Sequence, residues 1–334
     1  MPRQTIDDSR WLDLVTRDAA ATAFHHPAWS HALATAYGFR PLLVTVEENG
    51  ALVSGLPVLE IRSLRGRRWV ALPFTDRCAP LGSERYAARL VAELEHARAE
   101  AGVASLEVRE PLPLDGAEQL NFVRHVVPLG PDVDAVERRY TPAVRRAIRQ
   151  GEASGAQIRV ATTEDDVAEA FYALHIDTRR RLGLPVQPRR FFRQLWRSLG
   201  PDLCRTLLLE LHGRPIAGVV LLRWNTNLVF KYGASDHRHW GLRPNNLLFA
   251  ETIRWACANG FTEFDLGRTD VGAETLRRFK RGWGAQEDSL EYRRIGKGRT
   301  VVEAGSSTVL RAALRHSPRW VVRLTGEVVY RHAA

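Results

Sequence analysis

The sequence contains few cysteines and no long apolar run. Cys78, Cys204 and Cys257 are far apart and form no CxxC pair. This spacing argues against a disulfide framework or a zinc site and is typical of a reducing compartment. The apolar runs are far shorter than the roughly 20 residues that span a bilayer, and residues 1–11 contain no apolar segment of the signal-peptide kind. These absences predict a cytoplasmic protein without a membrane-spanning helix.

Several motifs with well-defined chemistry are also missing. The sequence contains no Ser–His–Asp arrangement, no Walker loop and no dinucleotide fingerprint. The pair His25–His26 and the pair His237 and His239 have no acidic or cysteine partner at ligand spacing, so no metal site is predicted.

The charge balance is strongly basic. The chain has 334 residues, enough for two ordinary domains, and carries a net charge of +10. This excess favours nucleic acid, phosphorylated molecules or anionic membranes as partners, although an arginine-rich composition can also reflect a GC-rich genome. Five arginines lie between positions 138 and 149. They form either a solvated helix face or a rim that guides a phosphate-rich donor.

A weak internal repeat organises the chain. Residues 42–59 are predicted to form a hairpin, and residues 207–222 repeat the pattern. The turns contain Asn-Gly and His-Gly, which are typical of two-residue hairpin turns. When Gly50 is aligned with Gly213, a second glycine five residues later also aligns without a gap.

The same three elements are predicted after each hairpin, namely a strand, an amphipathic helix that ends at a glycine, and another strand. They cover residues 68–72, 86–101 and 105–108 in the first half, and residues 227–232, 246–259 and 263–266 in the second. This is the element order of the GNAT acyltransferase fold. The predicted fold class is therefore α/β, with two tandem GNAT-like (acyl-CoA N-acyltransferase-type) domains, each built on a mixed twisted sheet. The domains are expected at residues 1–128 and 129–296, followed by a basic tail at 297–334.

The second half of the chain contains a series of distinctive motifs. They are Thr178-Arg179-Arg180-Arg181-Leu182-Gly183-Leu184-Pro185, Tyr232-Gly233-Ala234-Ser235, Leu242-Arg243-Pro244-Asn245-Asn246-Leu247-Leu248, Phe264-Asp265-Leu266-Gly267-Arg268-Thr269 and Phe279-Lys280-Arg281-Gly282-Trp283-Gly284. These motifs resemble those of the FemABX aminoacyltransferases and of related FemAB-like proteins. The order and spacing agree over residues 170–294, whereas the first half resembles the family only loosely.

The resemblance implies an aminoacyltransferase with no metal or redox cofactor. Studied members carry an amino acid from aminoacyl-tRNA to an amine of a peptidoglycan precursor, without a covalent enzyme intermediate. Some members have a phosphate-binding lysine in the opening motif, where this chain has Ser30-His31-Ala32. That departure argues against a nucleotide-linked acceptor and leaves lipid-linked, polysaccharide and small-molecule amines open.

The resemblance also places Lys280 at the reaction centre, where a cation can stabilise the oxyanion of a tetrahedral intermediate. The alternative is that Lys280 lies on a solvated edge. Substrate contacts are implied for further motif residues, namely Arg181, Tyr232, Asn245, Asp265, Arg268, Thr269, Phe279, Gly282 and Trp283.

Three of these residues have alternative interpretations. Asp265 either serves the acceptor amine or pairs structurally with Arg268. Tyr232 either lines the site or belongs to the core. Arg181 either binds phosphate or carboxylate, or belongs to a surface charge run.

The segment before the predicted helix 246–259 bears on the identity of the donor. Acetyl-CoA enzymes bind pyrophosphate there through backbone N–H groups. In this sequence Arg243 replaces a small residue, and Pro244 has no N–H to donate. An acyl-CoA-dependent N-acyltransferase acting on a sugar or peptide amine is therefore the second hypothesis. A non-catalytic module that binds nucleic acid or the cell envelope is the third.

The tail at 297–334 has seven basic residues against two glutamates. Arginines recur every fourth residue between Arg311 and Arg323 among apolar residues, and Pro318 is predicted to divide the tail into two short helices. Such a segment is typical of an interfacial membrane helix, which would hold the enzyme at the inner face of the membrane. The alternative is a helix packed on the first domain.

Overall fold

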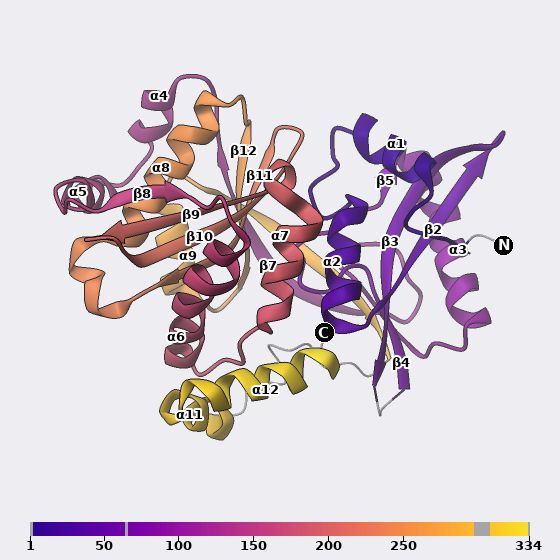
Figure 1. Ribbon diagram of the computed structural model, residues 1–334. Helices are drawn as coiled ribbons and strands as arrows, with labels where there is room; N and C mark the ends of the chain where they lie inside the picture. The colour runs from indigo at the N-terminus through magenta and orange to yellow at the C-terminus, as the bar shows by residue number, and fades with distance from the viewer. Residues whose placement is uncertain (1–2, 64–65, 297–307, 333–334) are drawn as a thin grey trace. The chain divides into compact units, whose positions relative to one another are not determined.

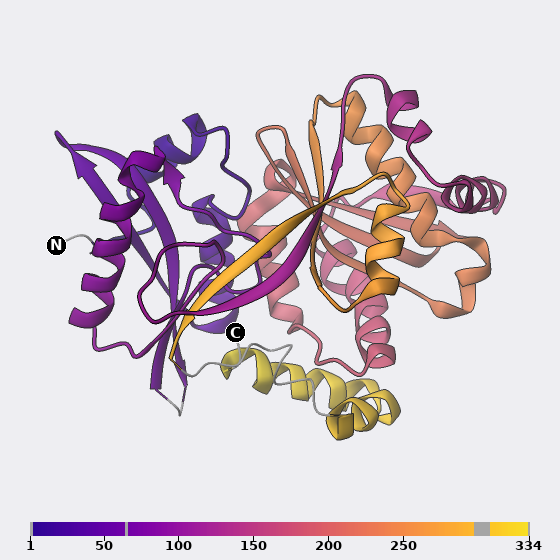
Figure 2. The same cartoon turned by 180° about the vertical axis from the view of Figure 1, so that it is seen from behind.

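The computed structural model describes residues 3–63, 66–296 and 308–332 (Figure 1). The chain forms two compact units. Unit 1 comprises Met1–Phe122, Ser289–Ala304 and Val328–Ala334, and unit 2 comprises Val123–Asp288 and Gly305–Glu327. The long strands β7 (Glu118–Pro128) and β13 (Gln286–Ile295) have residues in both units and can be followed in Figure 2.

Unit 1 contains a mixed sheet with helices on both faces. Its strand order is β1-β2-β3-β4-β6-β13, and β5 pairs with β3. Only β4 and β6 pair in parallel; the other pairs with a described register are antiparallel. The strands are β1 (Arg3–Gln4), β2 (Arg40–Glu48), β3 (Ala51–Ser63), β4 (Gly66–Val70), β5 (Leu81–Gly82) and β6 (Ser105–Val108).

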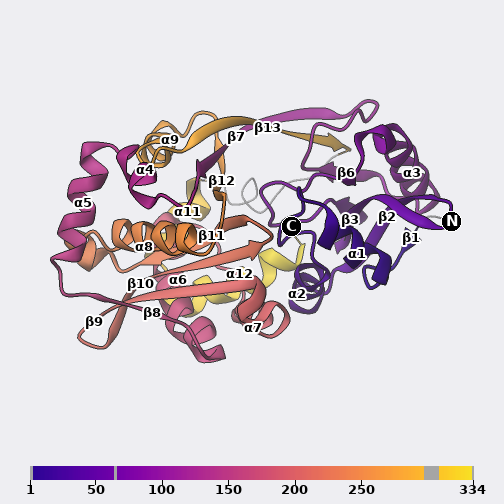
Figure 3. The ribbon, with the colours of Figure 1, turned by 90° about the horizontal axis from the view of Figure 1, so that it is seen from above.

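Helices α1 (Ser9–Arg17) and α2 (Pro27–Tyr37) lie on one face of the unit 1 sheet, and α3 (Ala87–Glu100), preceded by the short turn η1 (Glu84–Tyr86), lies on the other (Figure 3). The start of α2 follows from its sequence, because Pro27 fits the first helical position and the His26 side chain accepts a hydrogen bond from the N–H of Ala28. Gly38, with φ 77°, ends the helix in the left-handed conformation.

Unit 2 contains the second mixed sheet, in the order β7-β12-β11-β10-β9-β8. β11 and β12 are parallel, whereas β8, β9, β10 and β11 pair in antiparallel fashion. The strands are β8 (Gln157–Val160), β9 (Cys204–Leu211), β10 (Arg214–Trp224), β11 (Asn227–Ser235) and β12 (Glu263–Asp270).

Helices cover both faces of the unit 2 sheet (Figure 3). On one face lie α4 (Val133–Arg138), α5 (Pro142–Glu152), α8 (Pro244–Ala258) and α9 (Glu274–Arg281); on the other lie the π-helical turn η2 (Asp166–Phe171), α6 (Tyr172–Leu182) and α7 (Arg189–Leu203). The 3₁₀ turn η3 (His237–Leu242) leads from β11 into α8. Side chains such as Leu221, Ile253, Phe264 and Trp283 are fully buried in one core cluster between the sheet and α8.

The predicted internal repeat is present in detail. Both hairpin turns have two residues with positive φ, Asn49 (52°) and Gly50 (79°) in the first and His212 (51°) and Gly213 (72°) in the second. This conformation matches the twist of the adjoining strands. Each hairpin then skips one residue in its strand register, three positions after the turn glycine. The two hairpins therefore share the turn and the bulge as well as the strand order.

The glycines that align five residues after each turn also have matching roles. A Cβ atom at Gly55 would lie 2.9 Å from the Trp11 ring, and one at Gly218 would lie 2.9 Å from the Phe171 ring. In both units an aromatic side chain from a preceding helical segment packs directly on the strand backbone, which requires glycine.

The described part of the tail forms two helices, α11 (Thr308–His316) and α12 (Arg319–His332), separated by Pro318 as predicted. Residues 297–307 of the predicted tail lie outside the described residues. Within unit 2, α11 lies against the end of α6, where a Cβ atom on Gly183 would be 2.5 Å from the Arg311 carbonyl oxygen. Within unit 1, the Tyr330 ring packs against Tyr37 and Phe74.

Candidate active site

A cavity lies in unit 2 where β11 and β12 separate. The two strands pair over Asn227–Val229 and Glu263–Asp265, and beyond this point β11 continues to Ser235 and β12 to Asp270. The cavity has a volume of about 400 Å³, within the range of small-molecule sites. It is lined by residues of β10, β11 and β12 and of helices α6, α8 and α9. All of these residues belong to unit 2.

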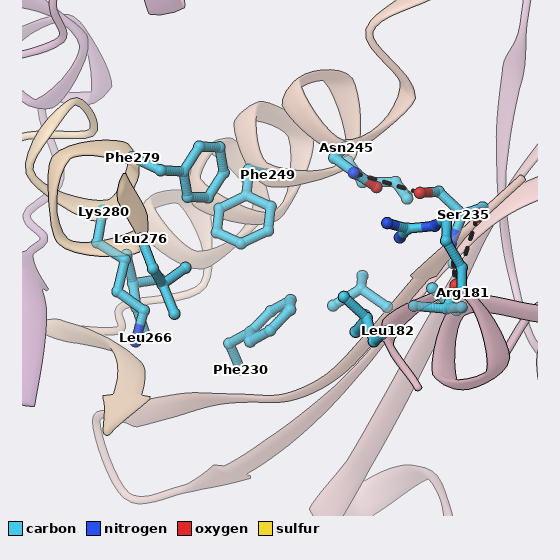
Figure 4. A pocket seen from close by; sticks show the side chains of 16 residues that line it. Arg181, Leu182, Phe230, Ser235, Asn245, Phe249, Leu266, Leu276, Phe279 and Lys280 are labelled. Atoms are coloured by element: carbon cyan, nitrogen blue, oxygen red, sulfur yellow. Dashed lines mark hydrogen bonds between the residues drawn. The ribbon is translucent and has the colours of Figure 1, made fainter. Parts of the chain in front are cut away.

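Aromatic rings form the middle of the cavity (Figure 4). The rings of Phe230 and Phe249 lie 5.0 Å apart between centroids, and Phe279 meets Phe249 edge-on at 5.7 Å. Phe230 occupies this position because β11 skips Lys231 in its pairing with β10, and because Gly233 leaves room for the ring. A Cβ atom at Gly233 would lie 2.6 Å from the Phe230 ring. A ligand here meets an apolar wall.

One end of the cavity is polar. The Ser235 hydroxyl accepts hydrogen bonds from Trp240 Nε1 at 3.0 Å and from Asn245 Nδ2 at 3.3 Å. Thr178 holds the Ser235 main chain, because its hydroxyl accepts from the Ser235 N–H at 3.1 Å. Both acceptor positions of the Ser235 hydroxyl are thus used, which leaves its proton to donate to a ligand oxygen.

Arg181 lies at the same polar end and is stacked on Trp240, with 4.4 Å between its guanidinium carbon and the ring centroid. Partial burial lowers the pKa of Arg181. Among the described side chains, no carboxylate lies within ion-pair distance of this arginine. A half-buried cation with unused donors is suited to binding an anionic group of a ligand.

Lys280 marks the opposite end of the cavity (Figure 4) and is only 6% exposed. Its Nζ donates to the Gly267 carbonyl at 2.8 Å, to the Thr269 hydroxyl at 2.8 Å and to the Arg268 carbonyl at 3.3 Å. These three acceptors match the three donors of an ammonium group. They hold a positive charge at the end of β12, beside the apolar wall.

A buried polar chain continues from Lys280 towards Glu287. The Thr269 hydroxyl lies 3.4 Å from His125 Nδ1, and His125 Nε2 lies 2.8 Å from a Glu287 oxygen. Arg277 holds the pKa of Glu287 at about 2, so this carboxylate only accepts hydrogen bonds at neutral pH. The proton of a neutral His125 must then be on Nε2, and Nδ1 accepts from Thr269.

The charge state of His125 agrees with this direction. Burial and the nearby charge of Lys280 lower the pKa of His125, against the opposing effect of Glu287. The imidazole is therefore neutral at pH 7, and the hydrogen bonds run from Lys280 to Thr269, from Thr269 to His125 and from His125 to Glu287.

Comparison with known proteins identifies the segment that carries this cavity. Residues 138–281 match the family model of the acetyltransferase (GNAT) domain. The matched segment contains every residue that lines the cavity. No curated protein matches the chain at the level of sequence.

The structure of FemX is similar to the chain at a TM-score of 0.70, with 14% sequence identity over 88% of this chain and 97% of FemX. The C-terminal domain of an Agrobacterium fabrum protein described as a lysylphosphatidylglycerol synthetase has a TM-score of 0.57 and 15% identity, over 92% of this chain and 95% of that domain. A tandem GNAT protein from the clavulanic acid biosynthesis pathway has a TM-score of 0.55 and 13% identity, over 89% and 98%. The predicted fold of two tandem GNAT-like domains is confirmed.

The GNAT domain brings four of the ten predicted site residues to the cavity wall, namely Arg181, Asn245, Phe279 and Lys280. Thr269 and the Arg268 carbonyl contact the Lys280 ammonium group instead. These six residues therefore gather around one cavity.

The other four lie elsewhere in unit 2. The Tyr232 ring packs among His175, Phe191 and Phe192. Asp265 forms a 2.7 Å ion pair with Arg124 and accepts from the Gly267 N–H, which is the geometry of a structural carboxylate. Trp283 is in the core, and Gly282 lines a separate depression.

Two residues at the site, Phe249 and His125, were not predicted from the sequence. Phe249 follows Asn245 by one helical turn on α8, so helical periodicity could have placed it on the same wall. His125 lies 155 positions before Lys280 in the sequence and outside every motif, and no local pattern connects it to Thr269.

Proposed function

We propose that this protein transfers an aminoacyl group from aminoacyl-tRNA to an amine of a cell-envelope precursor, at the inner face of the cytoplasmic membrane. The fold, the cavity with Lys280 at one end and the likeness to FemX support the transfer. None of the helices described is long and apolar enough to cross a membrane.

The backbone N–H groups at the start of α8 indicate which kind of donor the enzyme uses. In an acyl-CoA enzyme the first-turn N–H groups of this helix would bind the pyrophosphate. Here Pro244 has no N–H, and the N–H of Asn246 donates to the Arg243 carbonyl at 3.0 Å. Only one of the first three helical positions, Asn245, keeps its N–H for an anion. This favours a donor that does not depend on a pyrophosphate at this helix.

The chemistry requires little of the protein, because the ester of an aminoacyl-tRNA is already activated. The acceptor amine attacks the ester carbonyl, a tetrahedral intermediate forms, and its collapse makes the amide and releases the ribose hydroxyl. The negative charge on the carbonyl oxygen develops beside Lys280. Of the three Lys280 contacts, the 3.3 Å bond to the Arg268 carbonyl is the longest and is the one that the oxyanion replaces.

Lys280 can carry the proton that the reaction moves. The attacking amine must lose a proton, and the departing ribose oxygen must gain one. The Lys280 ammonium group gives a proton to the ribose oxygen and takes one back from the nitrogen that attacked, while Thr269, His125 and the Glu287 carboxylate hold the Lys280 nitrogen in place. In the net reaction the amine proton ends on the ribose hydroxyl, and no covalent intermediate with the enzyme is formed.

The donor test uses the purified chain, a pool of charged tRNA labelled in the amino acid, and a mixture of envelope precursors with free amines. We expect the label to leave the tRNA only when an acceptor is present, and mass spectrometry to detect an aminoacylated precursor. If the label stays on the tRNA and a labelled acyl-CoA is consumed instead, the proposal is wrong.

An acyl-CoA donor is the second candidate, because the matched family model is an acetyltransferase domain. Under this alternative, CoA should raise the melting temperature of the purified chain, whereas charged tRNA should not.

A further inference from the structure

Helix α12 has an apolar stripe on its exposed side. Trp320, Leu324 and Val328 follow one another at four-residue spacing and are 63%, 58% and 64% exposed. Residues four apart lie on the same side of a helix. The stripe is therefore continuous over two turns of α12.

Over its residues up to Glu327, which belong to unit 2, the other side of α12 is packed within that unit. Val322 is fully buried, and the backbone at Gly326 lies so close to Val186 that a Cβ atom there would be 1.9 Å from the Val186 carbonyl oxygen. Glu327 forms a 2.6 Å ion pair with Arg190. The helix is thus held by its buried face, and the stripe points away from the residues that hold it.

A basic depression adjoins the start of the stripe. It has a volume of about 510 Å³ and includes five arginines from α6, η3, α11 and α12, namely Arg180, Arg181, Arg238, Arg315 and Arg319. Its two carboxylates are already paired with Arg238 and Arg319, so the depression has an excess of positive charge. Trp320, the first residue of the stripe, directly follows Arg319 in α12.

We propose that the stripe of α12 and this basic depression together form a docking surface for an anionic phospholipid bilayer. The arginines face the lipid phosphates, and Trp320, Leu324 and Val328 enter the boundary between headgroups and acyl chains. Basic side chains beside an exposed tryptophan and aliphatic residues are the features that bind helices to such interfaces.

The composition of the surface argues against two other partners. A stable protein interface uses about 20–30 residues on each side, far more than the three side chains of the stripe. RNA would be attracted by the arginines, but Leu324 and Val328 offer it neither charge nor a stacking surface. A lipid bilayer can contact both the arginines of the depression, through its phosphates, and the apolar stripe, through its acyl chains.

Docking also relates to the active site. Arg181 lines both the basic depression and the cavity that contains Lys280. A lipid-linked acceptor whose phosphate binds at the arginines would thus have its reactive group close to the cavity. This last point rests on the proposed function, but bilayer docking itself does not, because it can be measured without turnover.

The experiment measures co-sedimentation of the full chain with vesicles of phosphatidylcholine, with and without phosphatidylglycerol. We expect binding only when phosphatidylglycerol is present. The triple variant W320S/L324S/V328S should bind about tenfold more weakly, because it loses most of the buried apolar area. A double variant of the depression, R180Q/R315Q, should also weaken binding and make it less sensitive to salt.

Two exposed apolar residues elsewhere provide the matched control. L12S/V271S removes side chains that are 39% and 49% exposed, and it should bind as the unchanged chain does. Melting temperatures of all variants verify folding, and R180Q/R315Q leaves the stripe intact if the triple variant melts early. Equal binding of the triple variant to vesicles that contain phosphatidylglycerol would overturn the proposal. Transfer to a soluble amine, assayed separately, shows whether the proposed function fails or holds.

Discussion

Lys280 differs from a solvent-exposed lysine in that protein oxygens surround its ammonium group. The Gly267 carbonyl and the Thr269 hydroxyl both lie 2.8 Å from Nζ. These bonds fix the charge before a substrate arrives, so little reorganisation is needed when the oxyanion forms. The cost is that a ligand must displace the weakest of the three contacts.

Replacing Lys280 with methionine should therefore lower kcat by a factor of about 10²–10³ while changing KM little, because the charge acts mainly in the transition state. Methionine keeps much of the apolar stem, so the cavity should retain its shape. Single-turnover transfer from labelled aminoacyl-tRNA measures the effect.

Lys231 provides the matched control. It lies on β11 outside the cavity lining, with its ammonium group 4.9 Å from the Tyr232 ring centroid. K231M should retain near-normal kcat. If both lysine variants lose activity equally, a specific role for Lys280 is untenable.

At the residue scale, the sequence predicts which residues line the cavity better than it predicts their partners. The family motifs place Lys280, Asn245, Phe279 and Arg181 at one cavity. They do not reveal that Asp265 pairs with Arg124 or that His125 lies next to Thr269, because both partners come from β7, far away in the sequence. Contacts between distant strands depend on tertiary packing, which local patterns do not encode.

Elements were easier to predict because their signals are local. The Asn-Gly and His-Gly turns and the glycines that end helices gave both hairpins and both following helices within a few residues of their observed bounds. The separation of β11 from β12 was not predicted. It depends on where pairing stops, and the irregularities just beyond this point, the skipped Lys231 in β11 and the positive φ of Gly267 in β12, appear only in the folded chain.

At the element scale, the close approach of α12 to Val186 requires a glycine at position 326. G326A would place a methyl group against the Val186 carbonyl oxygen, at an unrelaxed distance of 1.9 Å. The helix would have to shift, at a cost of about 1–3 kcal/mol in the free energy of unfolding. Hydrogen exchange should then speed up within residues 319–327 and remain unchanged in β9 and β10.

A glycine in open space serves as the comparison. Gly130 has no neighbouring atom within 4 Å of an added Cβ atom and no positive φ. G130A should melt like the unchanged chain. Unchanged exchange in α12 of G326A would mean that this close contact does not hold the helix.

At the scale of the whole molecule, two buried histidines link stability to pH, His25 in unit 1 and His175 in unit 2. Burial lowers the pKa of His25 in unit 1 to about 4 and that of His175 in unit 2 to about 3. Both stay neutral in the folded chain, whereas in the unfolded chain they protonate near pH 6.5. The free energy of unfolding therefore has its full value above about pH 6.5 and decreases as the pH falls towards 4, because in this range the two histidines bind protons only in the unfolded state.

Each histidine should contribute a slope of about 1.4 kcal/mol per pH unit in this window. Denaturant unfolding at pH 7.5 and pH 5.0 measures the slope, and H175Q should reduce it. H96Q, which removes a histidine from an exposed position of α3, should not. Identical slopes for H175Q and the unchanged chain would show that His175 titrates alike in both states.

The matching bulges and glycines of the two hairpins have a practical consequence. Gly55 and Gly218 occupy equivalent positions in the two hairpins, and of these two glycines only Gly218 borders the cavity. A substitution at Gly55 can therefore serve as an internal control for the same substitution at Gly218. A change that merely strains the scaffold can be made at Gly55 in unit 1, and its effect can be subtracted from that of the identical change at Gly218 in unit 2. Damage to architecture and damage to catalysis can thus be separated within one polypeptide.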